Sequence, residues 1–225
     1  DLASGIIHRL YKSGFKVVVL EIEKPLSIRR AVSFSESIYS REVEIEGVKG
    51  IFAESIEDIW EILKEGNIPI YIDPNGDIIN ILKPLAVVDA IMAKVNLGTN
   101  REMAAITIGV GPGFDAGVDV DLVVESKRAH SLGKVIYRGY AAPNTGIPST
   151  TLGYREERVL RAPKDGIFKS NYKIGDRVNK GDIVCYVGDV EVLAEIDGIL
   201  RGILKDGLYV TSGLKIGDID PRCQV

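Results

Sequence analysis

The last third of the chain contains an internal repeat with an offset of 32 residues. The segment that starts at Ala162, APKDGIFKSNYKIGDRVNKGDIV, aligns without gaps to the segment that starts at Ala194, AEIDGILRGILKDGLYVTSGLKI, and eight of the 23 pairs are identical. Each copy runs from Asp-Gly through an apolar residue to two further glycines, a pattern typical of short strands joined by tight turns. The repeat predicts a small barrel with two-fold pseudo-symmetry in residues 156–225.

Two such halves that close on each other resemble the barrel-sandwich hybrid of biotinyl and lipoyl carrier domains. In those carriers, the hairpin between the halves presents a modified lysine. Here the connecting stretch from Asp182 to Leu204 contains no lysine. The resemblance therefore implies a small all-β barrel-sandwich hybrid without biotin or lipoate, which could dock on a partner or close over a neighbouring site.

Cys185 and Cys223 are the only cysteines. Two cysteines are too few for a disulfide framework and lack metal-ligand spacing, which favours a reducing cytoplasm and no metal site. Cys185 lies in the apolar run GDIVCYVG, where no adjacent cation would lower the pKa of its thiol. We expect it to be buried as a small hydrophobic residue.

Residues 1–155 alternate apolar strand candidates with helical segments, which favours a mainly parallel sheet covered by helices. The expected strands are 16–22, 68–72, 104–110 and 135–137, and the expected helices are 2–13, 56–65 and 86–95. The predicted fold class is α/β, with a Rossmann-like domain over residues 1–155 and the barrel over residues 156–225. The first strand of the Rossmann-like unit is expected to precede Asp1.

The charge balance argues against some partners. A formal net charge of -4 and the absence of a long basic run argue against nucleic acid. The longest apolar runs are too short or too interrupted for a membrane span. The pairs Arg29-Arg30 and Lys127-Arg128 could each bind one small anion, with a solvated helix face as the alternative for the first pair.

The start of the chain has the spacing of a dinucleotide-binding unit. In such units a glycine-rich turn precedes the first helix, and an acidic residue about 20 residues later binds the ribose hydroxyls. Gly5 and Glu21 occupy the positions of the final glycine and of that acid. Structural roles for both residues remain an open alternative.

A second glycine-rich stretch, AAITIGVGPGFDAGVD, follows an apolar strand directly. Gly111, Pro112 and Gly113 would expose backbone N–H groups at the carboxyl end of the sheet, where open α/β folds bind phosphate or carboxylate ligands. No lysine follows at the spacing of a kinase-like phosphate loop, so that class is excluded. A tight structural turn is an equal alternative.

Cationic and polar residues follow this stretch. Lys127, Arg128 and His130 lie within four residues of one another, and Asn144 and Thr145 lie in the polar loop that comes next. Histidine titrates near pH 7, although a lone histidine is more often structural. His8 has no comparable neighbours, and we expect it to be a packing or surface residue.

Several stretches together resemble the accessory proteins of the selenium-dependent molybdenum hydroxylase system, of the YqeB type. The matching stretches are DLASGIIHRLYKSGFKVVVLEI, PLSIRRAVSFSESIY, DAIMAKVNLGT, IGVGPGFDAGVDVDLVVESKRAHSLGKVIYRG, APNTGIP and LKIGDIDPR. Lys94 enters through the third stretch, and its alternative is a lysine at a helix end. The resemblance also implies that segments present in the family are missing at both ends of the chain.

The resemblance implies a cytoplasmic maturation protein that binds molybdenum cofactor (molybdopterin) or a nucleotide-bearing anionic ligand at the glycine-rich loop. Its partners would be a molybdenum hydroxylase and other maturation proteins, and a homo-oligomer is possible. Two alternatives stay open, an NAD(P)- or nucleotide-dependent enzyme and a structural docking protein. No catalytic residue is assigned. The residues expected to bind the ligand are Gly5, Glu21, Arg29, Arg30, Lys94, Gly111, Pro112, Gly113, Lys127, Arg128, His130, Asn144 and Thr145.

Overall fold

The computed structural model describes residues 2–223, which divide into two compact units. One unit combines residues 3–74 with residues 147–223, and the other contains residues 75–146. This division differs from the boundary expected at residue 155, because the C-terminal strands pack with residues 3–74. No helix among the described residues has the length and apolar character needed to cross a membrane.

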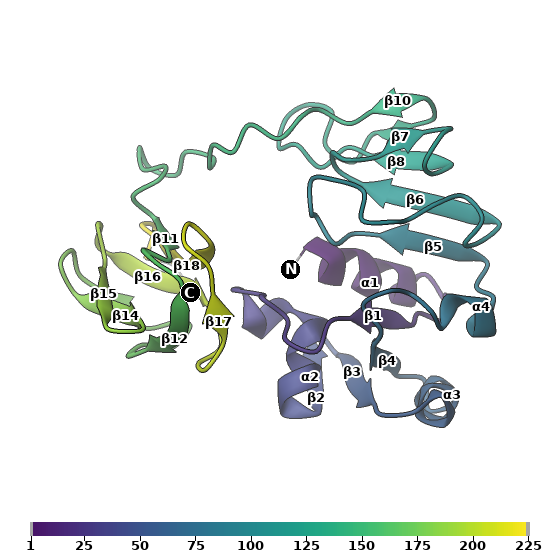
Figure 1. Ribbon diagram of the computed structural model, residues 1–225, viewed down its shortest axis with the longest axis horizontal. Coiled ribbons are helices and arrows are strands. Elements are labelled where there is room, and N and C mark those ends of the chain that lie inside the picture. Colours follow the sequence, from purple (N-terminus) through teal and green to yellow (C-terminus); the bar gives the residue numbers. More distant parts are fainter. Residues whose placement is uncertain (1, 224–225) are drawn as a thin grey trace. The chain divides into compact units, whose positions relative to one another are not determined.

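Residues 3–74 are organised by a four-stranded mixed sheet (Figure 1). The strand order is β1-β4-β3-β2, in which β1, β4 and β3 are parallel and β2 pairs antiparallel with β3. The strands are β1 (Val19–Glu21), β2 (Glu42–Ile45), β3 (Val48–Ala53) and β4 (Ile68–Ile72). The helices are α1 (Leu2–Lys12), η1 (Arg30–Val32), η2 (Phe34–Glu36), α2 (Ser37–Ser40) and α3 (Ile56–Lys64).

Local sequence signals explain why these elements form. The Ser55 side chain accepts a hydrogen bond from the Asp58 N–H and Asp58 caps Ser55 in return, so α3 begins with a capping box. Phe34, Ile68 and Ile70 are fully buried in the core of this sheet. The helices expected at 2–13 and 56–65 and the strand expected at 68–72 are confirmed.

Residues 75–146 contain a second, separate mixed sheet. The order is β5-β6-β8-β9, with β5, β6 and β8 parallel and β9 antiparallel to β8. A two-stranded sheet, β7 with β10, packs with it through Phe114, Val120 and Val123. The elements are α4 (Ile79–Leu82), β5 (Ala86–Asp89), β6 (Ile106–Val110), β7 (Asp115–Ala116), β8 (Leu122–Val124), β9 (Val135–Ile136) and β10 (Gly139–Tyr140).

The C-terminal part consists of two four-stranded antiparallel sheets, β11-β18-β16-β13 and β15-β14-β12-β17. The strands are β11 (Val159–Arg161), β12 (Gly166–Ser170), β13 (Arg177–Val178), β14 (Ile183–Val187), β15 (Val190–Leu193), β16 (Gly198–Ile203), β17 (Tyr209–Val210) and β18 (Lys215–Asp220). Three pairs of strands start 32 residues apart, which is the offset of the repeat: β12 and β16, β13 and β17, and β14 and β18. Each sheet therefore contains strands from both copies of the repeat.

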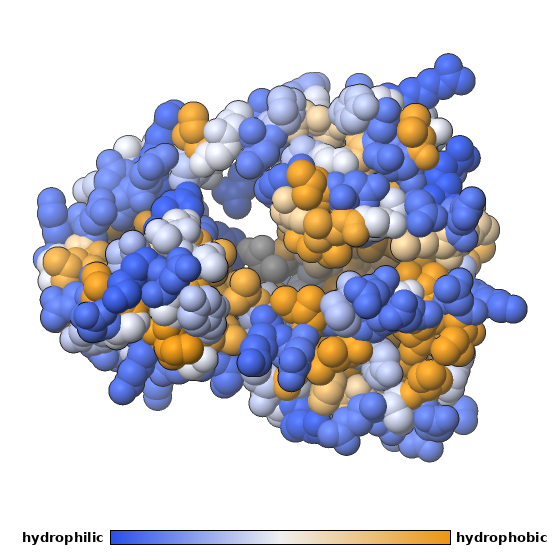
Figure 2. All heavy atoms as spheres, in the orientation of Figure 1, coloured by the Kyte–Doolittle hydropathy of each residue, from blue (hydrophilic) through white to orange (hydrophobic). Residues whose placement is uncertain are grey.

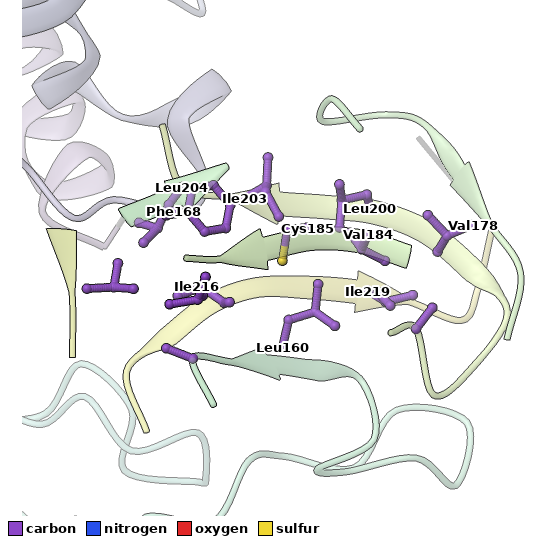
Figure 3. Close-up of a cluster of buried hydrophobic side chains, with 14 of the residues drawn as sticks. Leu160, Phe168, Val178, Val184, Cys185, Leu200, Ile203, Leu204, Ile216 and Ile219 are labelled. Carbon is purple, nitrogen blue, oxygen red and sulfur yellow. The ribbon is translucent and has the colours of Figure 1, made fainter. Parts of the chain in front are cut away.

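The two C-terminal sheets share one apolar core (Figure 3). Phe168, Leu200, Ile216 and Ile219 are fully buried in it. Cys185 points into the same cluster and is fully buried, which confirms the expectation from its sequence context. On the face seen in Figure 2, hydrophilic side chains predominate over this part of the molecule.

The predicted fold class is wrong. Residues 1–155 do not form one mainly parallel Rossmann-like sheet, because two short sheets each end in an antiparallel edge strand, β2 or β9. Residues 159–220 form two antiparallel sheets, and the barrel-sandwich hybrid assignment is not retained. The helix expected at 86–95 is also wrong, since Ala86–Asp89 is an edge strand that pairs with β6. Its β-branched Val87 and Val88 suit a strand better than a helix.

Candidate functional site

The candidate site lies in residues 75–146, at the carboxyl ends of three parallel strands. β5, β6 and β8 are neighbours in the sheet and run in the same direction, so their carboxyl ends meet at one edge. The segments that follow them begin at Ala90, Gly111 and Glu125. Ligands of open parallel sheets bind at such edges.

The glycine loop after β6 packs directly against the other two segments. Gly113 has φ +118°, and a Cβ placed on it would lie 2.8 Å from the Val95 backbone nitrogen. Gly111 has φ +81°, and its Cβ would lie 2.6 Å from Oγ of Ser126. Both positions therefore require glycine for backbone conformation and for space. These contacts bring the segment around Lys94 and the segment around Lys127 to the same loop.

The loop presents a backbone donor at the end of the sheet. The Gly111 N–H donates to the Val124 carbonyl at 2.8 Å, which holds the start of the loop on β8. Within residues 2–223, no oxygen accepts a hydrogen bond from the N–H of Gly113. Gly113 is only partly buried, so its N–H could donate to an oxygen of a bound anion.

The segment after β5 is shaped by Asp89. Its buried carboxylate accepts hydrogen bonds from the Ile91 N–H at 3.0 Å and from the Thr99 hydroxyl at 2.6 Å. Met92 and Lys94 both have positive φ, 64° and 71°, which non-glycine residues rarely adopt. Such strain persists where surrounding contacts determine the backbone. The exposed Lys94 ammonium is thus carried on a tightly constrained segment.

The segment after β8 is held by Glu125, which is 6% exposed. Its two carboxylate oxygens accept the N–H groups of Lys127 and Ala142, each at 2.7 Å. Burial raises the pKa of this carboxyl, but the N–H donors of Ala142, Lys127 and Ser126 together outweigh burial and hold the pKa below its ordinary value. The ionised carboxylate therefore ties the loop of residues 126–132 to the segment that begins at Ala142.

Lys127, Arg128 and His130 lie in the exposed hairpin loop between β8 and β9. Backbone bonds between Glu125 and residues 133–134 close this loop. Asn144 and Thr145 are exposed and follow Ala142, and the Asn144 side chain accepts the Gly146 N–H at 3.3 Å. The backbone thus connects these residues to the same sheet edge.

The other four predicted residues belong to the unit formed by residues 3–74 and 147–223. Gly5 is an exposed position inside α1 with open space around its missing Cβ. Glu21 ends β1, and burial raises the pKa of its carboxyl. Arg29 forms an ion pair with Asp218 at 3.1 Å. Arg30 bonds to Glu36 and to the Ile203 carbonyl. Their roles in ligand binding stay predictions.

Sequence reasoning missed Asp89, Glu125 and Ser126. The available signal was an acidic residue directly after a β-branched run, VVD in one case and VVE in the other. Glu125 lies in a stretch that drew attention for its cationic residues, and Asp89 lies in a stretch for which a helix was expected. Among residues 2–223, no three histidine, cysteine or acidic side chains are grouped as metal ligands would be.

A curated relative matches nearly the whole chain. The chain is 49% identical over 222 residues to the uncharacterized protein YqeB of Escherichia coli (strain K12), covering 99% of this chain and 41% of that protein. The expected resemblance to the YqeB type is thereby confirmed. The chain spans less than half the length of this relative. No protein-family profile matches the chain.

Solved structures resemble the chain only weakly. An aspartoacylase family protein from Mesorhizobium loti is 16% identical, with 35% of this chain and 32% of that chain covered and a TM-score of 0.27. The product-bound ectoine utilization protein EutE (DoeB) from Ruegeria pomeroyi is 12% identical, with 90% and 84% covered and a TM-score of 0.30. Likenesses this small carry no argument about this chain.

Proposed function

We propose that residues 75–146 bind an anionic, phosphate-bearing small molecule at the carboxyl ends of β5, β6 and β8. The observation that carries this proposal is the Gly113 N–H, which has no acceptor within residues 2–223, in a loop packed against the Lys94 segment and next to Ser126. A backbone donor in a loop that contacts the Lys94 segment and the segment beside Lys127 suits a phosphate, which offers several acceptor oxygens and negative charge.

The ligand is proposed to be molybdenum cofactor or its nucleotide form, held for a molybdenum hydroxylase and its maturation proteins. Molybdopterin carries a phosphate. Its assignment as the ligand rests on the resemblance to the YqeB type, and it fits a site in which we identify no nucleophile among the described residues. The acids of the site, Asp89 and Glu125, already accept backbone and hydroxyl donors, so they organise the loops. The two free cysteines suit a cytoplasmic, reducing compartment.

The test is native mass spectrometry of the protein purified from cells that make molybdenum cofactor. We expect a co-purifying mass that matches a pterin phosphate or its nucleotide form. Gly113→Ala should remove it, because the new Cβ would meet the Val95 backbone. Gly133→Ala is the matched control, since Gly133 also has positive φ, +79°, but has nothing within 4 Å of its missing Cβ.

The outcomes separate the alternatives. A nicotinamide nucleotide whose retention depends on Glu21 would replace the proposal with an NAD(P)-dependent enzyme. A protein that carries no small molecule but retains a hydroxylase subunit would replace it with a docking role. A pterin phosphate retained equally by Gly113→Ala and Gly133→Ala would refute the assignment of the glycine loop as its site.

A further inference from the structure

Three aliphatic side chains are exposed next to the glycine loop of the candidate site. Ile91, Val95 and Leu97, in the segment that follows β5, are 66%, 59% and 65% exposed. We call these three residues the aliphatic patch. On the face seen in Figure 2, hydrophobic side chains gather over the carboxyl ends of β5 and β6. The proposed phosphate contacts leave this apolar surface without a role.

The aliphatic patch starts directly beside Gly113. A Cβ placed on Gly113 would lie 2.9 Å from Cα of Val95. A carbon–carbon single bond is about 1.5 Å long, so the Cα atoms of Gly113 and Val95 are no more than about 4.4 Å apart. The Val95 side chain leaves the backbone at this contact and reaches solvent. The apolar surface therefore adjoins the N–H group that is proposed to bind the phosphate.

A second apolar contact lies at the other glycine of the loop. A Cβ placed on Gly111 would lie 3.3 Å from Cε of Met92, which is only partly buried. Met92 and Val95 come from the same segment, so this segment lines the glycine loop at both glycines. Apolar side chains around a small number of polar groups are the usual composition of a small-molecule site.

Hydrogen bonds hold the segment that carries the patch. The carboxylate of Asp89 accepts the Ile91 N–H at one end and the Thr99 hydroxyl at the other. The Asn96 side chain donates to the Thr99 carbonyl at 2.8 Å. Withdrawing the aliphatic side chains from water would require the backbone to give up these bonds. Apolar groups that are kept exposed on a fixed backbone indicate a surface that contacts a ligand.

The exposure of the patch favours a flat ring over an acyl chain. Each of its side chains remains 59–66% exposed, so the patch forms one wall. An acyl chain leaves water only when it is enclosed on several sides, because the gain is proportional to the apolar area removed from water. A planar heterocycle can lay one face on a single apolar wall and keep its polar edge in water.

We propose that the aliphatic patch binds the planar heterocycle of a ligand whose phosphate is bound by the Gly113 N–H. This inference rests on the proposed phosphate site and adds the class of group that lies beside it. Pterins and nucleobases share the required chemistry, since both are flat rings with polar edges. Val95 is the residue that favours a ring-bearing phosphate over a sugar phosphate, because it adjoins Gly113.

The test compares ring-bearing and ring-free phosphates by isothermal titration calorimetry of the whole chain. The probes are hydroxymethylpterin phosphate, GMP and ribose phosphate. We expect a ring-bearing probe to bind more tightly than ribose phosphate, and Val95→Ser to reduce this preference about tenfold, as the loss of one aliphatic contact would. Val95→Ile should retain it. Tighter binding of the pterin probe than of GMP would assign the ring as a pterin, and the reverse order would assign a nucleobase.

The matched control is Val118→Ser, the same substitution at a valine that is 69% exposed in the same unit. Val118 lies near Asp121, whose carboxylate accepts the Thr107 N–H at the start of β6, whereas the patch lies at the end of that strand. Val118→Ser should leave the preference for a ring-bearing probe unchanged.

The proposal is overturned if neither ring-bearing probe binds more tightly than ribose phosphate, or if Val95→Ser keeps the same preference as Val118→Ser. It is also overturned if light scattering shows a dimer that dissociates in Val95→Ser, because a second copy would then cover the patch. Gly113→Ala tests the phosphate site separately and should weaken the binding of all three probes. Unchanged binding of ribose phosphate by Gly113→Ala would refute the phosphate site, whereas an unchanged preference in Val95→Ser refutes this inference alone.

Discussion

Replacing Glu125 by glutamine tests how the candidate site is held together. The carboxylate accepts the Lys127 and Ala142 N–H groups on different oxygens, both at 2.7 Å. Glutamine keeps one carbonyl oxygen, so one of these N–H groups would lose its acceptor and face an NH₂ group. A hydrogen bond to a charged group contributes about 1.5–3 kcal/mol. We expect Glu125→Gln to lower the free energy of unfolding by about that amount.

The assay is urea unfolding of both proteins, combined with hydrogen exchange of residues 126–146. Exchange should accelerate at Lys127 and Ala142 in the variant. The carboxyl pKa of Glu125 is lowered by folding, so its contribution is present above the unfolded value of 4.5 and is lost as pH falls through the folded pKa. The difference between the two proteins should therefore shrink below pH 4.5.

The control is Glu157→Gln, which changes an exposed carboxylate that accepts the Arg155 N–H at 2.8 Å. It should have a much smaller effect, because water can replace the lost contact. The reasoning is refuted if Glu125→Gln is no more destabilising than this control, or if its effect does not change between pH 7 and pH 4.

Two further predictions concern the other compact unit. The thiol reagent DTNB should label Cys223 in the folded protein but Cys185 only after denaturation, because Cys185 is buried and burial raises its pKa to about 12. Rapid labelling of two thiols in native buffer would contradict this prediction. Gly202→Ala should destabilise by about 1–3 kcal/mol, because its Cβ would lie 3.0 Å from the Ile28 carbonyl oxygen. Gly5 lies inside α1 with open space around its missing Cβ, so Gly5→Ala should instead stabilise the folded protein by about 0.5–1 kcal/mol. Equal urea midpoints for the Gly202→Ala and Gly5→Ala variants would contradict the predicted packing at Gly202.

Local signals predicted several elements well. The apolar run at 68–72 became β4 without a change of boundary, and the amphipathic segment at 56–65 became α3. The glycine stretch indeed follows a parallel strand, so the backbone positions Gly111 and Gly113 at the sheet edge as the pattern predicted. These features depend on residues close in the sequence, whose conformational preferences act within a few positions.

Long-range contacts decided the rest. A single apolar run at 86–95 fits a helix or a strand, and pairing with β6 selected the strand. The sequence around Arg29 is compatible with an anion site and with an ion pair. Only folding brought Arg29 to Asp218, which is 189 residues away along the chain. The sequence by itself determined the repeat, and it determined the turn glycines because these follow from local backbone preference. The tertiary structure alone decided sheet order and charge pairing, because both depend on contacts between segments distant along the chain.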